Sequence, residues 1–346
     1  MSCHLGSRKS GLSHRKWILF SLVHRLYFFR LFIVKEDVTL QRFLATASIC
    51  GFVPRIFLEA AVSPGALEQA KSDILGAIKS CKDIEDAIDA VVGDLVVPHR
   101  AFVIYPGDQD RLLLGCLVKP TSEYAIDTIM MILDLRGADA ALDLYKSVQS
   151  SPRAAAFRGH IWERKVHNYF RHSAPSFVIR SLDTLNNSTT PNERTIPDER
   201  KTRSLDLSKG MKYFAFGPPQ MLAGKIAECV AEKEAVYLQL SQNFASLDSI
   251  IYQPNDPLVG IQITISDAHP IKVTDLSALQ KLLKSKDPLL ASLRPTVREP
   301  WILLFVVPTP MENSFSKQVF TGVPANWSKK TMQYVLGLDL HQVFRA

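Results

Sequence analysis

The chain has 346 residues, of which 47% are hydrophobic and 22% charged, a composition typical of a globular protein with room for two domains. The formal net charge is +7, but residues 1–35 contain seven Lys and Arg residues and no acid, so residues 36–346 sum to zero. The five cysteines are scattered without a Cys-x-x-Cys pair, so the composition argues against a basic nucleic-acid-binding body, a disulfide framework and a zinc site, and it fits a reducing compartment.

The basic leader, residues 1–35, includes an apolar segment at residues 17–34. A membrane-spanning helix needs about 20 apolar residues, and Arg25 and Arg30 inside this segment would each cost roughly 2.5–3.5 kcal/mol near the centre of a span. No small-residue cleavage site follows the basic start, so the pattern is not that of a signal peptide. We therefore expect a buried or poorly ordered leader, or one that results from a mispredicted start, in an intracellular protein without a membrane partner; export stays open.

Residues 36–150 are predicted to form a mainly helical domain. Helical spacing runs through residues 38–92, and the Ser-Pro-Gly sequence that begins at Ser63 is a typical helix start. Residues 101–105 are expected to be a strand, followed by a turn and a second short strand. Two more helices are expected before residue 150, with the break at Gly137.

Ser151–Pro152 marks the expected start of the second domain, residues 151–346. Its elements alternate as helix, strand, strand, helix, hairpin, helix and strand, which predicts an α/β fold with a mixed sheet flanked by helices. Residues 184–209 are polar and are expected to be an exposed insertion. Residues 300–308 are a continuous apolar run, typical of a strand covered on both faces. The helices expected in this domain are residues 153–172, 220–240 and 274–293, the last capped by Thr274 or Asp275.

The first of these helices carries an acid on a small and apolar stripe. The stripe consists of Ala156, Gly159, Glu163, Val166 and Phe170, at steps of three and four residues. Burying a lone carboxylate is costly unless it is paired or binds a metal ion. Two interpretations follow: Glu163 lies at the edge of the stripe and pairs with His160 or His167, or it belongs to a site.

A predicted hairpin over residues 247–266 supplies further polar groups. Asp248 opens its first strand, and Gln262 and Thr264 share one face of the second. Together with Glu163 this is the layout of a metal-dependent phosphodiesterase, in which oxygen ligands hold Mg²⁺ or Mn²⁺. In the alternative interpretation Asp248 caps a turn, and the other two side chains face solvent.

Basic residues are frequent around the helix of Glu163, and Arg164, Lys165 and Arg171 are expected on the side of the helix opposite the stripe. They either contact phosphates or form a solvated helix face. The cluster consists of Arg153, Arg158, Arg164, Lys165, Arg171 and Arg180, with His160, His167 and His172.

The segments "AAAFRGHIWERKVHNYF", "NFASLDSIIYQP" and "GIQITISDAHPIK" resemble the C-terminal effector module of Crinkler proteins and of the related retrotransposon hot spot proteins. The matching positions are Gly159, Trp162-Glu163 and His167, then Asp248-Ser249, then Gln262, Thr264 and His269-Pro270-Ile271-Lys272. The match extends over residues 153–275, with the pieces in the same order and spacing.

This resemblance implies a restriction-endonuclease-like domain and a metal-dependent DNA endonuclease. Glu163, Asp248 and Gln262 would then bind Mg²⁺ or Mn²⁺, and Thr264, His269 or Lys272 would assist the reaction. Residues 36–150 resemble the end of the family's NTPase region, which implies a mainly helical, winged-helix-like domain in a member truncated at its N-terminus. DNA or a host protein is the implied partner, and a nucleus is the implied site of action.

Two features depart from the family. The phosphate-binding motif GxxxxGK[ST] is missing, so no ATP site is expected. Where the nuclease fold usually has Glu/Asp-x-Lys, this chain has Gln262 and Thr264; a neutral amide is a weaker ligand than a carboxylate, and Thr cannot replace the charge of Lys, although Lys272 could supply it. The sequence thus leaves two functions open: a nuclease, and a non-catalytic module that binds nucleic acid or a host protein. It does not give the oligomeric state.

Overall fold

The computed structural model describes two compact units, divided between residues 132 and 133. The residues that it describes are 38–51, 54–81, 100–106, 116–150, 154–173, 176–182, 202–207, 211–215, 219–240, 246–283, 288–322 and 326–346. The predictions for the leader, residues 1–35, lie outside these ranges. Within them, no helix is long and apolar enough to cross a bilayer.

The first unit is mainly helical where the structure describes it. Its elements are α2 (Leu40–Cys50), α3 (Pro54–Val62), α4 (Pro64–Ser80), the antiparallel strands β1 (Phe102–Pro106) and β2 (Cys116–Pro120), and most of α6 (Glu123–Arg136). The predicted start of α4 is confirmed, since the Ser63 side chain accepts a hydrogen bond from the backbone N–H of Ala66, with Pro64 in the first turn. The strand pair and the helices expected up to residue 81 are therefore confirmed, whereas residues 82–92 of the expected helical stretch lie outside the described ranges.

Gly51 shows why this unit requires a glycine after α2. Its φ is 61°, and a Cβ built there would lie 1.9 Å from the carbonyl oxygen of Thr121. Any side chain would collide with the backbone where β2 leads into α6.

The second unit is built on an eight-stranded mixed sheet with the order β4-β3-β12-β10-β8-β7-β6-β5. Its strands are β3 (Ser176–Ser181), β4 (Thr202–Asp206), β5 (Lys212–Ala215), β6 (Val236–Gln239), β7 (Ser249–Tyr252), β8 (Val259–Ile263), β10 (Trp301–Pro308) and β12 (Thr331–Leu338). β10 runs parallel to β8 and β12, whereas β6, β7 and β8 form an antiparallel series. The α/β class and the mixed sheet are confirmed.

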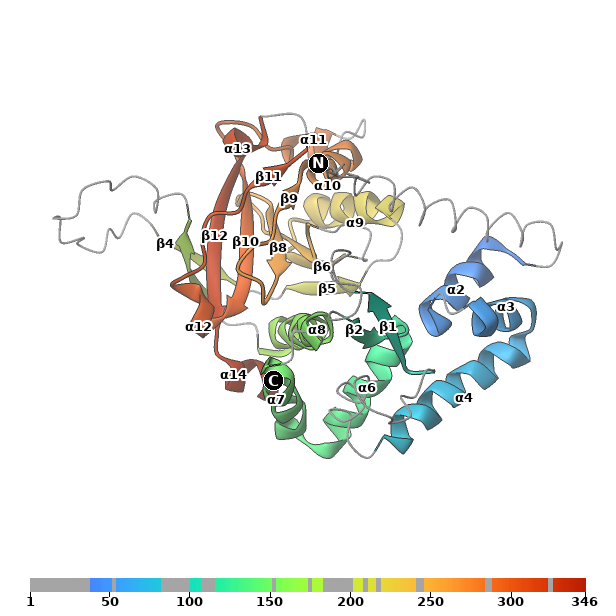
Figure 1. Cartoon of the computed structure of the whole chain (residues 1–346). Coiled ribbons are helices and arrows are strands. Elements are labelled where there is room, and N and C mark those ends of the chain that lie inside the picture. Colours follow the sequence, from blue (N-terminus) through green and yellow to red (C-terminus); the bar gives the residue numbers. More distant parts are fainter. Residues whose placement is uncertain are drawn as a thin grey trace, which may run out of the picture. The chain divides into compact units, whose positions relative to one another are not determined.

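The helices of this unit are α7 (Ala138–Ser147), α8 (Ala155–Ser173), α9 (Pro219–Glu232), α10 (Val273–Leu282), α11 (Pro288–Ser292), α12 (Thr309–Glu312), α13 (Trp327–Lys330) and α14 (Leu340–Arg345), with short parallel strands β9 (Ile271–Lys272) and β11 (Phe320–Thr321). These helices pack on the sheet or, like α7 and α14, on the helix α8 (Figure 1). Successive side chains of β6 point to opposite faces of the sheet. Leu238 belongs to the same core cluster as Leu222 and Ile226 of α9. Tyr237, on the other face, contacts His167 and Phe170 of α8.

Strands β8 and β10 are buried along their whole length. All eight residues of β10 are buried, as are all five of β8. The prediction of a strand covered on both faces is thus confirmed for β10, and the predicted hairpin is confirmed as β7 and β8.

Several boundaries differ from the predictions. The helix expected to extend to residue 240 ends at Glu232, because Val236–Gln239 is β-branched and aromatic and pairs between β5 and β7. The expected insertion at residues 184–209 is corrected at its end, where Thr202–Asp206 pairs with β3 and Leu205 is buried; residues 184–201 lie outside the described ranges.

The helix expected over residues 274–293 is divided into α10 and α11. The N-cap of α10 is Lys272 and makes no side-chain capping bond, so the expected cap at Thr274 or Asp275 is wrong.

The division between units falls inside α6, earlier than the expected boundary at Ser151. Helix α7 packs against α8 and α14, and Lys165 of α8 binds Asp134 near the end of α6 with an Nζ–Oδ1 distance of 2.7 Å. These contacts place the end of α6 and all of α7 with the sheet domain.

Candidate functional site

Asp248 lies at the open end of the β7–β8 hairpin. Its backbone N–H donates to the carbonyl of Ile261 (2.8 Å), one step beyond the Ser249–Ile261 pair. The next amide of β8 on this side, Ile263 N–H, is bonded by the Asp248 side chain instead, at 2.6 Å from Oδ2. The carboxylate thus continues the ladder at the point where the two strands part, and its position is fixed by the backbone.

Gln262 lies opposite Asp248 and holds the same carboxylate oxygen. Its Nε2 donates to Asp248 Oδ2 at 2.8 Å, and the side chain is only 6% exposed. Its Oε1 is buried without a hydrogen-bond partner. The interpretation in which Gln262 faces solvent is therefore wrong, and an orphaned amide oxygen remains in the interior, where such groups call for an explanation.

Thr264 is also buried, two residues further along the chain. Its backbone N–H donates to Val306 O of β10 (3.0 Å), and its Oγ1 accepts from the backbone N–H of Ser266 (3.0 Å). The hydroxyl therefore anchors the turn that ends β8, while its own hydrogen stays available for donation.

Glu163 lies at the edge of the buried face of α8, one third exposed. Its two carboxylate oxygens lie 3.7 Å from His160 Nδ1 and 3.8 Å from His167 Nε2. Burial alone would raise its pKa, but the interactions with the two adjacent histidines and their positive charge when protonated lower the pKa to about 2. The predicted pairing with histidines is confirmed, and it keeps Glu163 ionised at neutral pH.

This lowered pKa predicts how stability changes with pH. Because the folded-state pKa is about 2 and the ordinary value is 4.5, the ionised form contributes stability above pH 4.5 that is lost as the pH falls toward 2. Relative to Glu163→Gln, the wild type should lose about 1–2 kcal/mol of unfolding free energy over this range, after allowance for solvent screening of a one-third exposed group. Urea unfolding at pH 6, 4 and 2.5 measures the difference; a constant difference would contradict the prediction.

His167 connects Glu163 to the sheet. Its Nδ1 lies 2.5 Å from the hydroxyl of Tyr237 on β6, and its ring meets the Tyr237 ring edge-on. The imidazole is 6% exposed, and its Nε2 is buried without a hydrogen-bond partner. The sequence did not point to Tyr237, because this residue falls within the helix expected over residues 220–240, where an aromatic side chain is ordinarily a packing residue.

The charges of these groups act on one another. Burial raises the pKa of Asp248 well above its usual range, the negative charge of Glu163 raises it further, and the bonds from Ile263 and Gln262 offset only part of this rise. Burial also raises the pKa of Tyr237, and the charges of Asp248 and Glu163 add to that rise. The negative charge of Glu163 therefore disfavours the ionised forms of Asp248 and Tyr237.

The chain matches no protein-family model, no curated protein and no solved structure.

Lys272 and His269, which were expected to assist the reaction, are each held by a backbone hydrogen bond to a residue other than Asp248 and Gln262. The Lys272 side chain is exposed at the start of α10, and its backbone N–H donates to Ser246 Oγ (2.8 Å). The His269 backbone N–H donates to Gln318 Oε1 (2.6 Å). Within the described ranges, no hydrogen bond or ion pair joins the Lys272 side chain to Asp248 or Gln262.

Several of the basic residues around α8 have structural partners. Lys165, expected on the exposed side, is buried and binds Asp134. Arg158 donates to the carbonyl of Gln149 (2.5 Å), and Arg180 donates to the carbonyl of Glu312. These three cations serve packing within the domain. Arg164, Arg171 and His172 are exposed on the same helix.

The donor atoms of this site determine whether it can hold a metal ion. In the part of the chain that the structure describes, no three His, Cys, Asp or Glu side chains converge closely enough to hold an ion by themselves. The orphaned Gln262 Oε1 and His167 Nε2 are further donors beside the two carboxylates. The donor set therefore fits a divalent cation only if the amide oxygen of Gln262 takes part.

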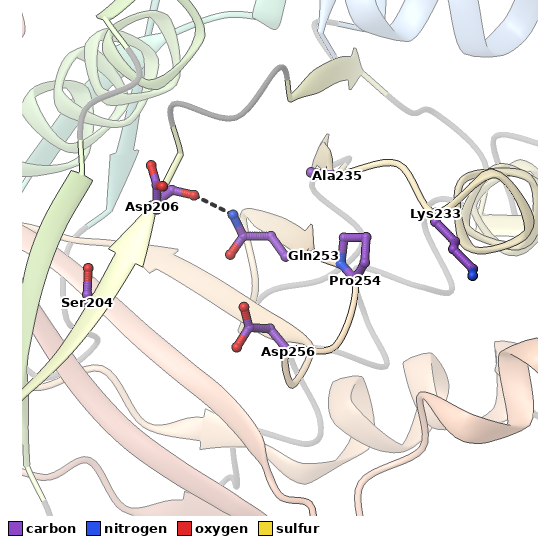
Figure 2. A pocket seen from close by; sticks show the side chains of 7 residues that line it. All are labelled: Ser204, Asp206, Lys233, Ala235, Gln253, Pro254 and Asp256. Atoms are coloured by element: carbon purple, nitrogen blue, oxygen red, sulfur yellow. Dashed lines mark hydrogen bonds between the residues drawn. The ribbon is translucent and has the colours of Figure 1, made fainter.

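A separate hollow of about 360 Å³ lies at the opposite end of the hairpin (Figure 2). It is lined by residues of β4, of the segment before β6 and of the β7–β8 turn, among them Asp206, Lys233 and Asp256. Asp256 is paired with Arg203 (2.6 Å), and Gln253 Nε2 donates to the carbonyl of Asp206. These bonds tie β4 to the turn, and the hollow is distinct from the carboxylate site.

Proposed function

We propose that the sheet domain is a restriction-endonuclease-like phosphodiesterase that cleaves DNA with Mg²⁺ or Mn²⁺. One observation carries the proposal: Gln262, which is bonded to the buried Asp248, has a buried amide oxygen without a hydrogen-bond partner. Carboxylate and amide oxygens are the donors that hard divalent cations prefer. A buried carboxylate and a buried amide oxygen without a ligand cost folding free energy. A functional role as metal ligands would explain why the protein keeps them.

Glu163, Asp248 and Gln262 would hold the ion. A bound divalent cation activates a water molecule and stabilises charge on the scissile phosphate. The protein's own contribution is positioning: the Ile263 amide and Gln262 fix Asp248 through Oδ2, and His160 and His167 keep Glu163 ionised. The hydroxyl hydrogen of Thr264 is free to donate to a phosphate oxygen, and Lys272 would assist only after its exposed side chain moved toward the site.

A second candidate is a non-catalytic module with the same fold that binds DNA or a host protein, acting in a nucleus. The observation that favours it is the replacement of Glu/Asp-x-Lys by Gln262 and Thr264. The Thr264 oxygen anchors the turn at Ser266, so this position supplies no positive charge beside Asp248.

Supercoiled plasmid, incubated with the full chain and 5 mM Mg²⁺ or Mn²⁺, tests the proposal. We expect nicking that falls about 10²–10³-fold in Glu163→Gln and in Asp248→Asn. The matched control is Asp267→Asn, an exposed aspartate four residues after Ile263, which should leave the rate unchanged. Retained DNA binding without nicking in the wild type would establish the binding module instead.

A further inference from the structure

Basic side chains are concentrated at the end of the sheet from which β10 and β12 start, where α10 and α13 also lie (Figure 1). Three segments carry them: α10, residues 293–300 before β10, and α13. We call this group the basic corner, and its members are Lys281, Arg294, Arg298, Lys329 and Lys330. Lys281, Arg298 and Lys329 are exposed, and the other two are half-buried. The proposed catalytic site gives these cations no role.

Two stacked tryptophans hold the three segments together. Trp327 of α13 packs on Trp301 of β10, with ring centroids 5.6 Å apart. Trp327 Nε1 donates to Ser277 Oγ of α10 (3.2 Å), and Trp301 Nε1 donates to the carbonyl of Leu293 (2.7 Å). Lys281 lies one turn after Ser277 on the same face of α10. The cations therefore project from fixed elements, so a ligand that they bind need not order a free tail.

Acids do not balance the charge of the basic corner. The three segments contain five cations and two acids, Asp275 and Glu299, and five minus two gives +3. Asp275 accepts from Ser246 Oγ (3.1 Å) in the first turn of α10. Within the described ranges, no ion pair joins a member of the corner to a carboxylate, and Arg294 Nε is buried without a hydrogen-bond partner.

This positive charge is a local excess. Residues 36–346 sum to zero, so the corner is positive because of where the fold places its cations. Like charges gathered on one surface repel one another and attract an anionic partner.

We propose that the basic corner binds the phosphate backbone of duplex DNA. The inference rests on the proposed function for its partner and names a second surface that holds the substrate. Each Lys or Arg that neutralises a phosphate releases a condensed counterion, which gives affinity without regard to base sequence. A lipid surface fits less well, because membrane-binding surfaces combine cations with several apolar anchors. In these three segments Val297 is the one large apolar side chain that is exposed.

The basic corner is separate from the carboxylate site. Ile263, whose amide is bonded by Asp248, pairs with Val306 of β10, five residues after Trp301. Five residues of strand span roughly 17 Å, which is about five base pairs of duplex at about 3.4 Å each. A change at the corner should therefore alter how tightly DNA is held and leave the reaction at Asp248 unchanged.

The test is fluorescence anisotropy of a labelled duplex, titrated with the full chain in EDTA at salt concentrations between about 50 and 200 mM. The variant is Lys281→Gln/Lys329→Gln/Lys330→Gln, which removes three charges of the corner. We expect its affinity at the lowest salt to be about 10–100-fold weaker than that of the wild type. The slope of log affinity against log salt should become shallower by about 2–3.

The matched control removes three lysine charges that already have a carboxylate partner, in Lys71→Gln/Lys212→Gln/Lys225→Gln. Its net charge equals that of the corner variant, and we expect it to bind DNA with the affinity and the salt slope of the wild type. Circular dichroism checks that each variant is folded. Should the corner variant fail to fold, Lys329→Glu, at an exposed position, should still lower the slope by about one.

The outcomes separate the two proposals. DNA binding that depends on the corner, in a protein that does not nick plasmid, would support the corner and overturn the phosphodiesterase. Nicking by the wild type, with equal DNA affinity in the corner variant and the control, would overturn the corner and leave the phosphodiesterase standing. Failure of the wild type to bind the duplex would also overturn the inference, and binding to phosphatidylserine vesicles in its place would assign the corner to a membrane surface.

Discussion

Replacing Asp248 by asparagine is expected to make the metal-free protein more stable at neutral pH. Burial and the charge of Glu163 raise the pKa of this carboxyl well above its usual range, so its ionised form is disfavoured in the folded state. Asparagine keeps the shape, and its amide oxygen can accept from both Ile263 and Gln262. The free energy of unfolding should rise by roughly 0.5–2 kcal/mol, the usual gain when a strained functional group is neutralised.

The sign follows from linkage. A pKa raised above the unfolded value of 3.8 favours the fold below that value, and this contribution disappears as the pH rises through the folded-state pKa. The advantage of Asp248→Asn should therefore be small at pH 4 and larger at pH 8, as measured by urea unfolding in the presence of chelator. Asp267→Asn, at an exposed position, is the control. A wild type as stable as Asp248→Asn at pH 8 would contradict the prediction.

The two carboxylates thus have pKa values shifted in opposite directions. Glu163 is held ionised by two histidines, and Asp248 is pushed toward its protonated form. Titratable neighbours whose pKa values are driven apart are typical of sites with assigned acid–base or ligand roles. A cation placed between them would favour the ionised form of Asp248, so the metal-free protein carries an electrostatic cost that metal binding would relieve.

Much of this fold could be predicted from periodicity. Three local patterns predicted features that the structure has. They are the strict alternation in β8, the apolar run of β10 and the break at Gly137 between α6 and α7. β6 was missed because Val236–Gln239 directly follows a helix with few turn residues between them, and only pairing with β5 and β7 fixes it as a strand.

The site was predictable only in part. Asp248, Gln262 and Glu163 could be selected because polar residues interrupt apolar patterns, but the sequence could not say that Gln262 is buried. Lys165 was expected on the exposed side of its helix and is buried, because Asp134, 31 residues earlier, supplies its charge partner. Tyr237 lies 70 residues from His167 in the chain, and no local pattern joins them.

Gln262→Glu is expected to convert the site into one that depends on metal for its stability. The new carboxylate would replace the amide whose nitrogen now lies 2.8 Å from Asp248 Oδ2. A hydrogen bond is thereby replaced by repulsion between two buried carboxylates. Without metal, the free energy of unfolding at pH 8 should fall by on the order of 3 kcal/mol. Acidification should restore part of the loss, because two adjacent carboxyl groups can share one proton.

Divalent cations should reverse this loss, since a third carboxylate strengthens binding and ligand binding to the folded state raises stability by mass action. We expect Mn²⁺ to raise the melting temperature of Gln262→Glu well beyond the rise seen in the wild type, as measured by differential scanning calorimetry with and without chelator. Gln342→Glu adds the same charge at an exposed position of α14 and should show neither effect. At a true metal site, the three carboxylates of the variant would bind a cation more tightly than the two of the wild type. A Gln262→Glu protein that is destabilised but not stabilised by cations would therefore show that Asp248 and residue 262 do not share an ion.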